Sequence, residues 1–195
     1  MLCLLCSIGC GNPQKETEQI VVDMMSGVER ILIDTDFQSC DFDMITDKIR
    51  ILNKNCQDKL TPMMDSKEIT MEDVERIFKH WQGINRERLQ EMYRSAAVSC
   101  ADDTIDCFLN DPNPNIVEVY RLWRQKTWLK MNVYACASSL LFENEKEGNS
   151  LLQETFKKEF LEKLNSDKTK SDLYEAYPDN CEFKEYINTG SLYYD

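Results

Sequence analysis

The sequence contains a single histidine, and this scarcity limits the catalytic chemistry open to the chain. Any Ser/His or Cys/His pair would have to use His80, which stands between Lys79 and Trp81 in a segment with helical periodicity. The sequence also lacks the G-x-S-x-G turn, the H-E-x-x-H zinc motif and a glycine-rich phosphate loop. We therefore expect a protein that is not an enzyme, unless the fold brings His80 and two carboxylates into one concave site.

Basic residues are also few. The chain has 23 Lys and Arg residues against 35 Asp and Glu residues, so its formal net charge is −12 and its pI is about 4.6. A surface of this sign repels nucleic-acid phosphates and anionic membranes, so we expect no nucleic-acid partner. Solubility outside the cell explains the acidity, and a basic protein partner is the alternative explanation.

Long apolar runs are missing as well. No segment approaches the ~18 apolar residues that cross a bilayer, so we expect no transmembrane segment. The apolar run over residues 2–9 has no basic residue before it, and the polar residues 12–19 follow it closely. Small residues at positions 7, 9 and 11 permit cleavage, so we predict that residues 1–11 are a signal peptide and that the protein is secreted. Two alternatives stay open: S-acylation of Cys3, Cys6 and Cys10 in a cytosolic protein, or lipoprotein processing at Cys10 in a bacterium.

The sequence predicts no metal site and no other cofactor. The leader has C-x2-C-x3-C spacing without a fourth ligand nearby, and the remaining cysteines are far apart. An EF-hand-like phase over residues 143–154 begins with Glu where Asp is expected, so we interpret it as an acidic helix break. Three groups of carboxylates are interpreted as helix caps and solvated loops: Asp34/Asp36, Asp41/Asp43 and Asp102/Asp103/Asp106.

Apolar residues at spacings of three and four predict helices through the rest of the chain. The predicted fold class is all-α: a disulfide-braced antiparallel bundle of about five helices, forming one domain over residues 12–195 with a frayed C-terminal tail. Thr70 and Asp73 predict a capping box, and Thr61-Pro62 predicts the start of a helix. The expected helices cover residues 19–33, 41–60, 70–100 with a pause at Gly83, 115–143 and 151–164, and the clearest loop covers residues 101–114.

Six cysteines follow the leader, and an even number predicts three disulfides in an oxidising compartment: Cys40, Cys56, Cys100, Cys107, Cys136 and Cys181. Cys40 and Cys56 bracket one predicted helix, whose sixteen residues span about 24 Å, so we exclude that pair. Cys100 and Cys107 can pair only if their helix ends near residue 101. Up-and-down topology favours Cys56–Cys136, with the other four cysteines pairing among themselves.

The function that these features favour is binding of another macromolecule, an unidentified protein that could be basic, rather than catalysis. Trp81, Trp123 and Trp128 are the candidate contact residues, because tryptophan is enriched at protein interfaces. The alternative is a secreted helical carrier of a lipid or other small apolar ligand, since aromatic and methionine side chains also line such cavities.

Overall fold

The computed structural model describes residues 12–37, 39–110 and 127–166, together with residues 168, 171–172 and 175. Five α-helices account for most of these residues, and no β-strand occurs among them. The predictions of an all-α fold and of a helical bundle are therefore confirmed. The helices are α1 (Pro13–Asp34), α2 (Phe42–Asp65), α3 (Met71–Asn110), α5 (Leu129–Leu141) and α6 (Glu145–Leu164).

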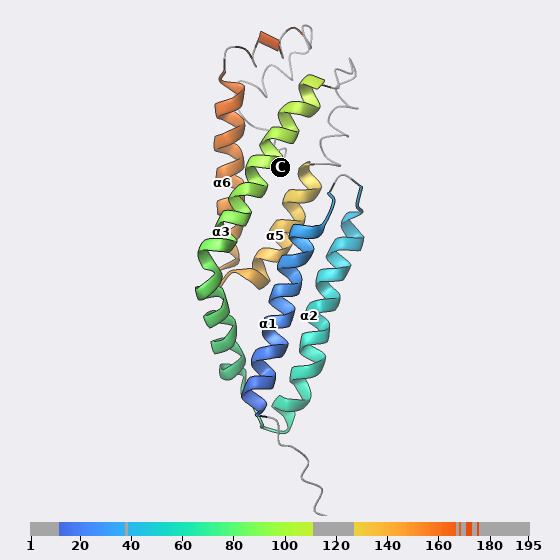
Figure 1. Ribbon diagram of the computed structural model, residues 1–195, viewed down its shortest axis with the longest axis vertical. Coiled ribbons are helices and arrows are strands. Elements are labelled where there is room, and N and C mark those ends of the chain that lie inside the picture. The colour runs from blue at the N-terminus through green and yellow to red at the C-terminus, as the bar shows by residue number, and fades with distance from the viewer. Residues whose placement is uncertain are drawn as a thin grey trace, which may run out of the picture.

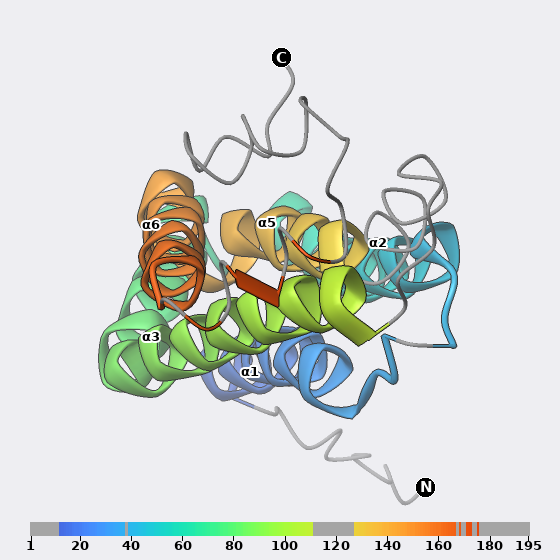
Figure 2. The same ribbon diagram turned by 90° about the horizontal axis from the view of Figure 1, so that it is seen from above.

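The helices are arranged around a hairpin. α1 and α2 lie antiparallel along the long axis of the molecule, and α3 runs back beside α1 (Figure 1). α5 packs against all four other helices, whereas α6 packs on α3 and α5 (Figure 2). The main contacts of α2 are with α1 and α5, so α2 forms an edge of the bundle.

α5 and α6 accompany only part of α3. α3 has 40 residues, or about 60 Å of helix, whereas α5 has 13 and α6 has 20. The turn between the two short helices lies beside the middle of α3, where Gln82 Nε2 donates to the Leu140 carbonyl oxygen at 3.3 Å. Glu147 Oε1 accepts from Arg86 Nε at 3.0 Å and from Gln90 Nε2 at 2.9 Å. The first turns of α3 therefore lie beyond α5 and α6 (Figure 1).

Tyr93 lies at the centre of the core and is fully buried. Its hydroxyl donates to the Tyr134 carbonyl oxygen at 2.8 Å, and its ring meets the rings of Tyr134 and Phe142 edge-on, at centroid distances of 5.1 and 4.8 Å. Edge-to-face geometry is favourable for aromatic pairs, and the hydrogen bond satisfies a polar group that burial would otherwise destabilise. These contacts join α3 to α5 and to the residue that ends α5.

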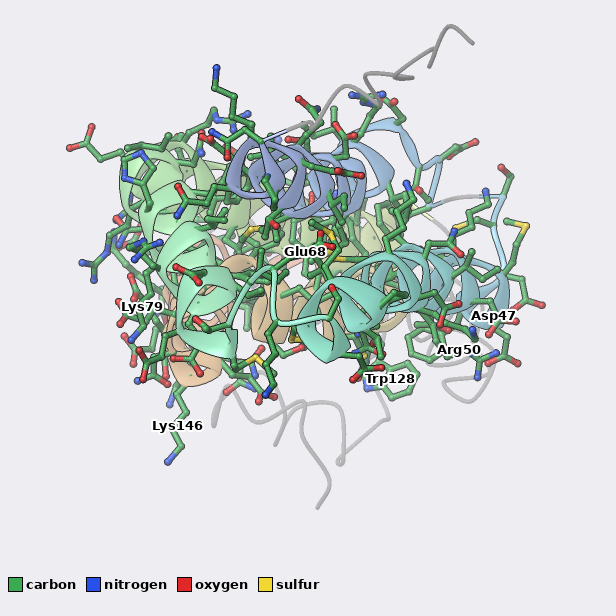
Figure 3. The ribbon with its side chains drawn as sticks, turned by 90° about the horizontal axis from the view of Figure 1, so that it is seen from below. Asp47, Arg50, Glu68, Lys79, Trp128 and Lys146 are labelled. Atoms are coloured by element: carbon green, nitrogen blue, oxygen red, sulfur yellow. The ribbon has the colours of Figure 1, made fainter. Side chains whose placement is uncertain are left out.

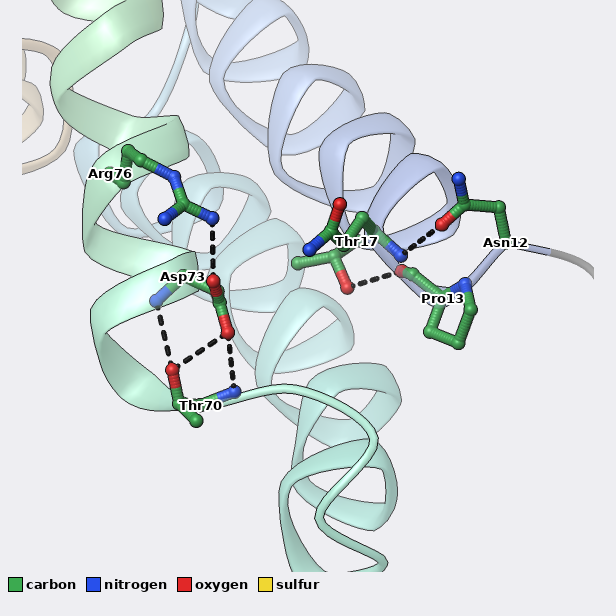
Figure 4. Close-up of polar contacts among 7 residues, drawn as sticks. Asn12, Pro13, Thr17, Thr70, Asp73 and Arg76 are labelled. Carbon is green, nitrogen blue, oxygen red and sulfur yellow. Dashed lines mark hydrogen bonds and ion pairs between the residues drawn. The ribbon is translucent and has the colours of Figure 1, made fainter.

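Side-chain caps define where most of the helices begin. Asn12 accepts from the Gln14 amide at 3.1 Å, Asp41 from the Asp43 amide at 2.8 Å and Asn144 from the Lys146 amide at 3.0 Å. The capping box of α3 is also present, because Thr70 Oγ1 accepts from the Asp73 amide at 3.2 Å and Asp73 Oδ2 accepts from the Thr70 amide at 3.0 Å (Figure 4).

Four local predictions were wrong. The acidic segment over residues 143–154 is not a helix break as a whole, because only residues 142–144 separate α5 from α6, which begins at Glu145. Pro62 does not start a helix but lies in the last turn of α2, which ends at Asp65 and is followed by Lys67 with a positive φ of 61°. α3 does not pause at Gly83. The predicted loop over residues 101–114 is helical as far as Asn110, because its apolar residues keep helical spacing and are buried: Ala101, Ile105 and Phe108. Residues 115–126, the leader and the tail from residue 176 lie outside the described residues.

The structure does not support the predicted disulfide bracing. None of the described cysteines forms a disulfide, and Cys181 lies outside the described residues; the described cysteines are Cys40, Cys56, Cys100, Cys107 and Cys136. Cys100 and Cys107 lie seven residues apart on the continuous helix α3, a separation of about 10 Å that no disulfide spans. Cys56 is buried in the C-terminal half of α2, whereas Cys136 is exposed on the short helix α5, so the favoured pair is not formed.

None of the described helices is both long enough and apolar enough to cross a bilayer.

Candidate binding groove

The three candidate tryptophans do not form one surface. Trp81 is 5% exposed and belongs to the core, and Trp123 lies outside the described residues. Trp128 is 37% exposed and projects outwards on the side of the molecule where Asp47 and Arg50 of α2 lie (Figure 3). Of the three, only Trp128 is described at the surface.

A groove of about 660 Å³ lies between α1 and α2. Its α1 side contains Gly27 and Ile31, and its α2 side contains Met44, Ile51 and Leu52. Arg30 and Lys48 flank it, and it reaches the connection between the helices at Asp34, Asp36 and Cys40. This volume is within the usual range for ligand sites in proteins, about 300–1,000 Å³. We call this hollow the α1–α2 groove.

Helical periodicity explains why the groove is lined from both sides. Gly27, Ile31 and Asp34 share one face of α1, and Met44, Lys48 and Ile51 share one face of α2. The neighbouring faces of the two helices are buried in the bundle, through Val28 and Leu32 on α1 and Ile45 and Ile49 on α2. The groove therefore runs along the outer side of the hairpin, which no described helix covers (Figures 1 and 2).

Gly27 controls how closely the walls of the groove approach each other. A Cβ atom at this position would lie 2.9 Å from Cδ1 of Leu52, closer than ordinary van der Waals contact. The absence of a side chain therefore lets Leu52 pack directly on the α1 backbone.

The groove exposes more apolar surface than a scattered residue would. Met44 is 46% exposed and Ile51 is 54% exposed, and the two lie seven residues apart on one face of α2. Single exposed apolar residues are common on soluble proteins, but contiguous apolar patches mark interaction sites. The sequence carried this signal, because Met44 and Ile51 fall outside the apolar stripe of residues 42, 45, 49, 52, 56 and 60 that predicted the helix.

Charged groups collect at the end of the groove near the α1–α2 connection. Burial raises the pKa of the Cys40 thiol above its ordinary value, and the carboxylates of Asp36 and Asp41 raise it further. A backbone hydrogen bond and the Lys48 ammonium lower the pKa, but the net effect is an increase. The thiol is therefore protonated near neutral pH and lacks the thiolate character of a nucleophilic cysteine.

A second hollow, of about 310 Å³, lies between the starts of α1 and α3 and is lined by His80, Glu18 and Asp73. This is the concave site with one histidine and two carboxylates that would support catalysis. However, Asp73 Oδ2 accepts from both the amide and the hydroxyl of Thr70, and Asp73 Oδ1 accepts from Arg76 Nη2 at 2.5 Å (Figure 4).

These hydrogen bonds determine the protonation state of the Asp73 carboxyl. The hydrogen bond from the Thr70 hydroxyl lowers the pKa of the Asp73 carboxyl most, followed by the Thr70 amide and Arg76. His80 is exposed and hydrogen-bonds to neither Glu18 nor Asp73. Asp73 is therefore an ionised helix cap, and the hollow lacks a coupled acid–base pair.

Within the described ranges, no three His, Cys, Asp or Glu side chains come together in a way that could hold a metal ion. Comparison of the chain with protein-family models, with curated proteins and with solved structures gives no match.

Proposed function

We propose that this chain binds another protein by accepting an amphipathic helix of that partner in the α1–α2 groove. The observation that carries the proposal is an apolar groove of about 660 Å³ on the side of two antiparallel helices that no other described helix covers. An amphipathic helix that binds in such a groove buries its apolar face through residues at positions i, i+3, i+4 and i+7.

The dimensions of the groove suit a helix of two to three turns. From Gly27 to Asp34, α1 contributes eight residues, which rise about 10 Å, and from Met44 to Leu52 α2 contributes nine residues, which rise about 12 Å. A third helix laid along two antiparallel helices uses the same packing of side-chain ridges into grooves that builds the bundle itself.

The alternative, a carrier of a small apolar ligand, fits the volume but is less compatible with the openness of the groove. Small-molecule sites bury about 70–90% of the ligand surface. Met44 and Ile51 are about half exposed, so a small ligand lying on them would keep one side in water, whereas a helix needs only one face covered.

Binding outside the cell is part of this proposal. Its support is the predicted signal peptide over residues 1–11 and the net charge of −12. The free thiols of the described cysteines do not add to that support.

The test uses a fluorescein-labelled synthetic helix with Leu and Ile on one face, equal numbers of Lys and Glu on the other, and no net charge. Its anisotropy is measured against the wild-type chain and against a double variant, Met44→Gln/Ile51→Gln. We expect the double variant to bind about 10- to 30-fold more weakly. Met44 and Ile51 are each about half exposed, so the peptide would bury the other half of each side chain, and glutamine gives up the free energy of that burial.

The matched control is Met71→Gln/Ile84→Gln, which removes two other exposed apolar side chains that do not line the groove. This control is expected to bind the peptide as the wild type does. Equal binding by the groove variant and the wild type would contradict the proposal. Tight binding of a fluorescent C16 fatty acid without binding of the peptide would favour the carrier.

A further inference from the structure

The end of the α1–α2 groove near the connecting segment carries three exposed carboxylates. Asp34 is the last residue of α1, Asp36 lies in the connection and Asp41 is the N-cap of α2. Asp34 and Asp36 line the groove directly, and Asp41 is near enough to act on the Cys40 thiol electrostatically. The two basic residues of the groove, Arg30 and Lys48, lie about 6 Å from Asp34 and about 10 Å from Asp41 along their helices. Lys48 also acts on the Cys40 thiol, so this end of the groove holds more carboxylates than cations.

Asp34 is in a position that its own helix disfavours. The C-terminus of an α-helix carries a partial negative charge, so a carboxylate there is destabilising. The last turn of α1 contains no basic residue that would offset this, and Asp34 enters no ion pair with any described residue. A cation bound at this end of the groove would relieve the repulsion.

Asp41 keeps acceptor capacity for a partner as well. Asp41 Oδ1 accepts from the Asp43 amide at 2.8 Å, and a carboxylate can accept about four hydrogen bonds, so this contact leaves room for a Lys or Arg side chain. Asp36, whose Oδ2 accepts from the Ser39 hydroxyl at 2.8 Å, adds its negative charge at the same end of the groove. The net charge of −12 also opposes the binding of a second copy of the chain and favours a cationic occupant.

We propose that the helix bound in the α1–α2 groove is cationic at one end, and that its Lys or Arg side chains bind Asp34, Asp36 and Asp41. This inference rests on the proposed function, and it adds both the chemistry of the partner and the direction in which its helix lies. The acidic end of the groove holds the cationic end of the helix, and the apolar residues follow toward Ile51.

The test compares two synthetic helices that share one apolar face and differ only at one end, which carries three Lys in the first peptide and three Glu in the second. We expect the lysine peptide to bind the wild-type chain about tenfold more tightly, and this preference to shrink as salt is added. In the triple variant Asp34→Asn/Asp36→Asn/Asp41→Asn the preference is expected to disappear. Asn is as good an N-cap as Asp, so the variant keeps the cap of α2.

The matched control is Glu75→Gln/Glu87→Gln/Glu154→Gln, which changes the net charge equally at exposed positions outside the groove. It is expected to keep the preference for the lysine peptide. If both peptides bind equally well and Met44→Gln/Ile51→Gln weakens both, the groove is a binding site and this inference is wrong. If neither peptide binds, the proposed function fails too. A chain that sediments as a dimer, and as a monomer after Met44→Gln/Ile51→Gln, would identify a second copy as the occupant.

Discussion

Replacing Gly148 by alanine should destabilise the protein, although the same change usually stabilises a helix. Gly148 is a buried residue in the first turns of α6. A Cβ atom there would lie 2.6 Å from Ser138 Oγ and 2.8 Å from Cδ2 of Phe142. Both neighbours are held in place, because Ser138 Oγ lies 3.1 Å from the Tyr134 carbonyl oxygen and the Phe142 ring packs edge-on against Tyr93.

The expected magnitude follows from two opposing effects. Overpacking of a core costs about 1–3 kcal/mol. The better helix propensity of alanine returns about 0.8–1 kcal/mol. The net loss in the free energy of unfolding for Gly148→Ala should therefore be up to about 2 kcal/mol, with Tm falling by about 2–4 °C per kcal/mol in a chain of this size.

Gly83 provides the matched control. It lies inside α3, and a Cβ atom there would meet nothing within 4 Å. Gly83→Ala should therefore stabilise the protein by about 0.5–1 kcal/mol, since only helix propensity changes. Urea unfolding followed by circular dichroism measures both variants under the same conditions.

The double variant Gly148→Ala/Ser138→Ala tests the mechanism. Removing the Ser138 hydroxyl takes away the closest contact of the new methyl group, so the two substitutions should destabilise less together than the sum of the single effects. A Gly148→Ala protein that is as stable as Gly83→Ala would refute the packing described for this junction of α5 and α6.

Three further predictions concern charge and thiols. Arg88→Met leaves the buried Glu29 carboxylate without its partner on α3, so the free energy of unfolding measured in urea should fall by about 1–3 kcal/mol. The double variant Arg88→Met/Glu29→Gln should recover part of this loss, and additive effects of the two substitutions would contradict the prediction. Burial raises the pKa of Cys100 and of Tyr134 to about 12, so the folded chain retains protons that the unfolded chain loses above its ordinary values of 9.0 and 10.0. These two groups should thus leave the free energy of unfolding unchanged below pH 9 and lower it by about 1.4 kcal/mol per pH unit per group toward pH 12. The fall should be less steep in Cys100→Ala, and a free energy of unfolding that does not change between pH 9 and pH 12 would contradict the prediction. Ellman's reagent should react with the exposed Cys136 in the native protein and with at least five thiols in denaturant, and fewer than five would show that disulfides form.

The local pattern of the sequence predicted most of the helices, because amphipathic spacing and cap chemistry depend on neighbouring residues alone. The capping box of Thr70 and Asp73 is the clearest case. Residues 101–110 were assigned to a loop because of the prolines and asparagines at positions 110–114, whereas packing of Ile105 and Phe108 into the bundle extends the helix. Tertiary packing overrides local preference in this way.

The α1–α2 groove could not be predicted from the sequence, since its existence depends on which helix faces the bundle covers. The pattern of Met44 and Ile51 places two apolar side chains off the buried stripe of α2, but it does not show that no described helix covers the outer side of the hairpin. The predicted pairing of cysteines is unsupported for a similar reason: an even number of thiols indicates a compartment, but the course of α3 and α5 decides whether the thiols that they carry can meet.

The short length of α5 and α6 makes the two ends of this molecule unequal in thickness. Among the described residues, the first eleven residues of α3 pack mainly against α1, apart from the ion pair between Lys79 and Glu143, so fewer buried contacts oppose local opening there. Amide protons in these turns should exchange with deuterium sooner than those around Tyr93. The end of the molecule that contains the start of α3 is thus expected to open first. The α1–α2 groove lies toward the other end, so it should stay formed when this local opening occurs.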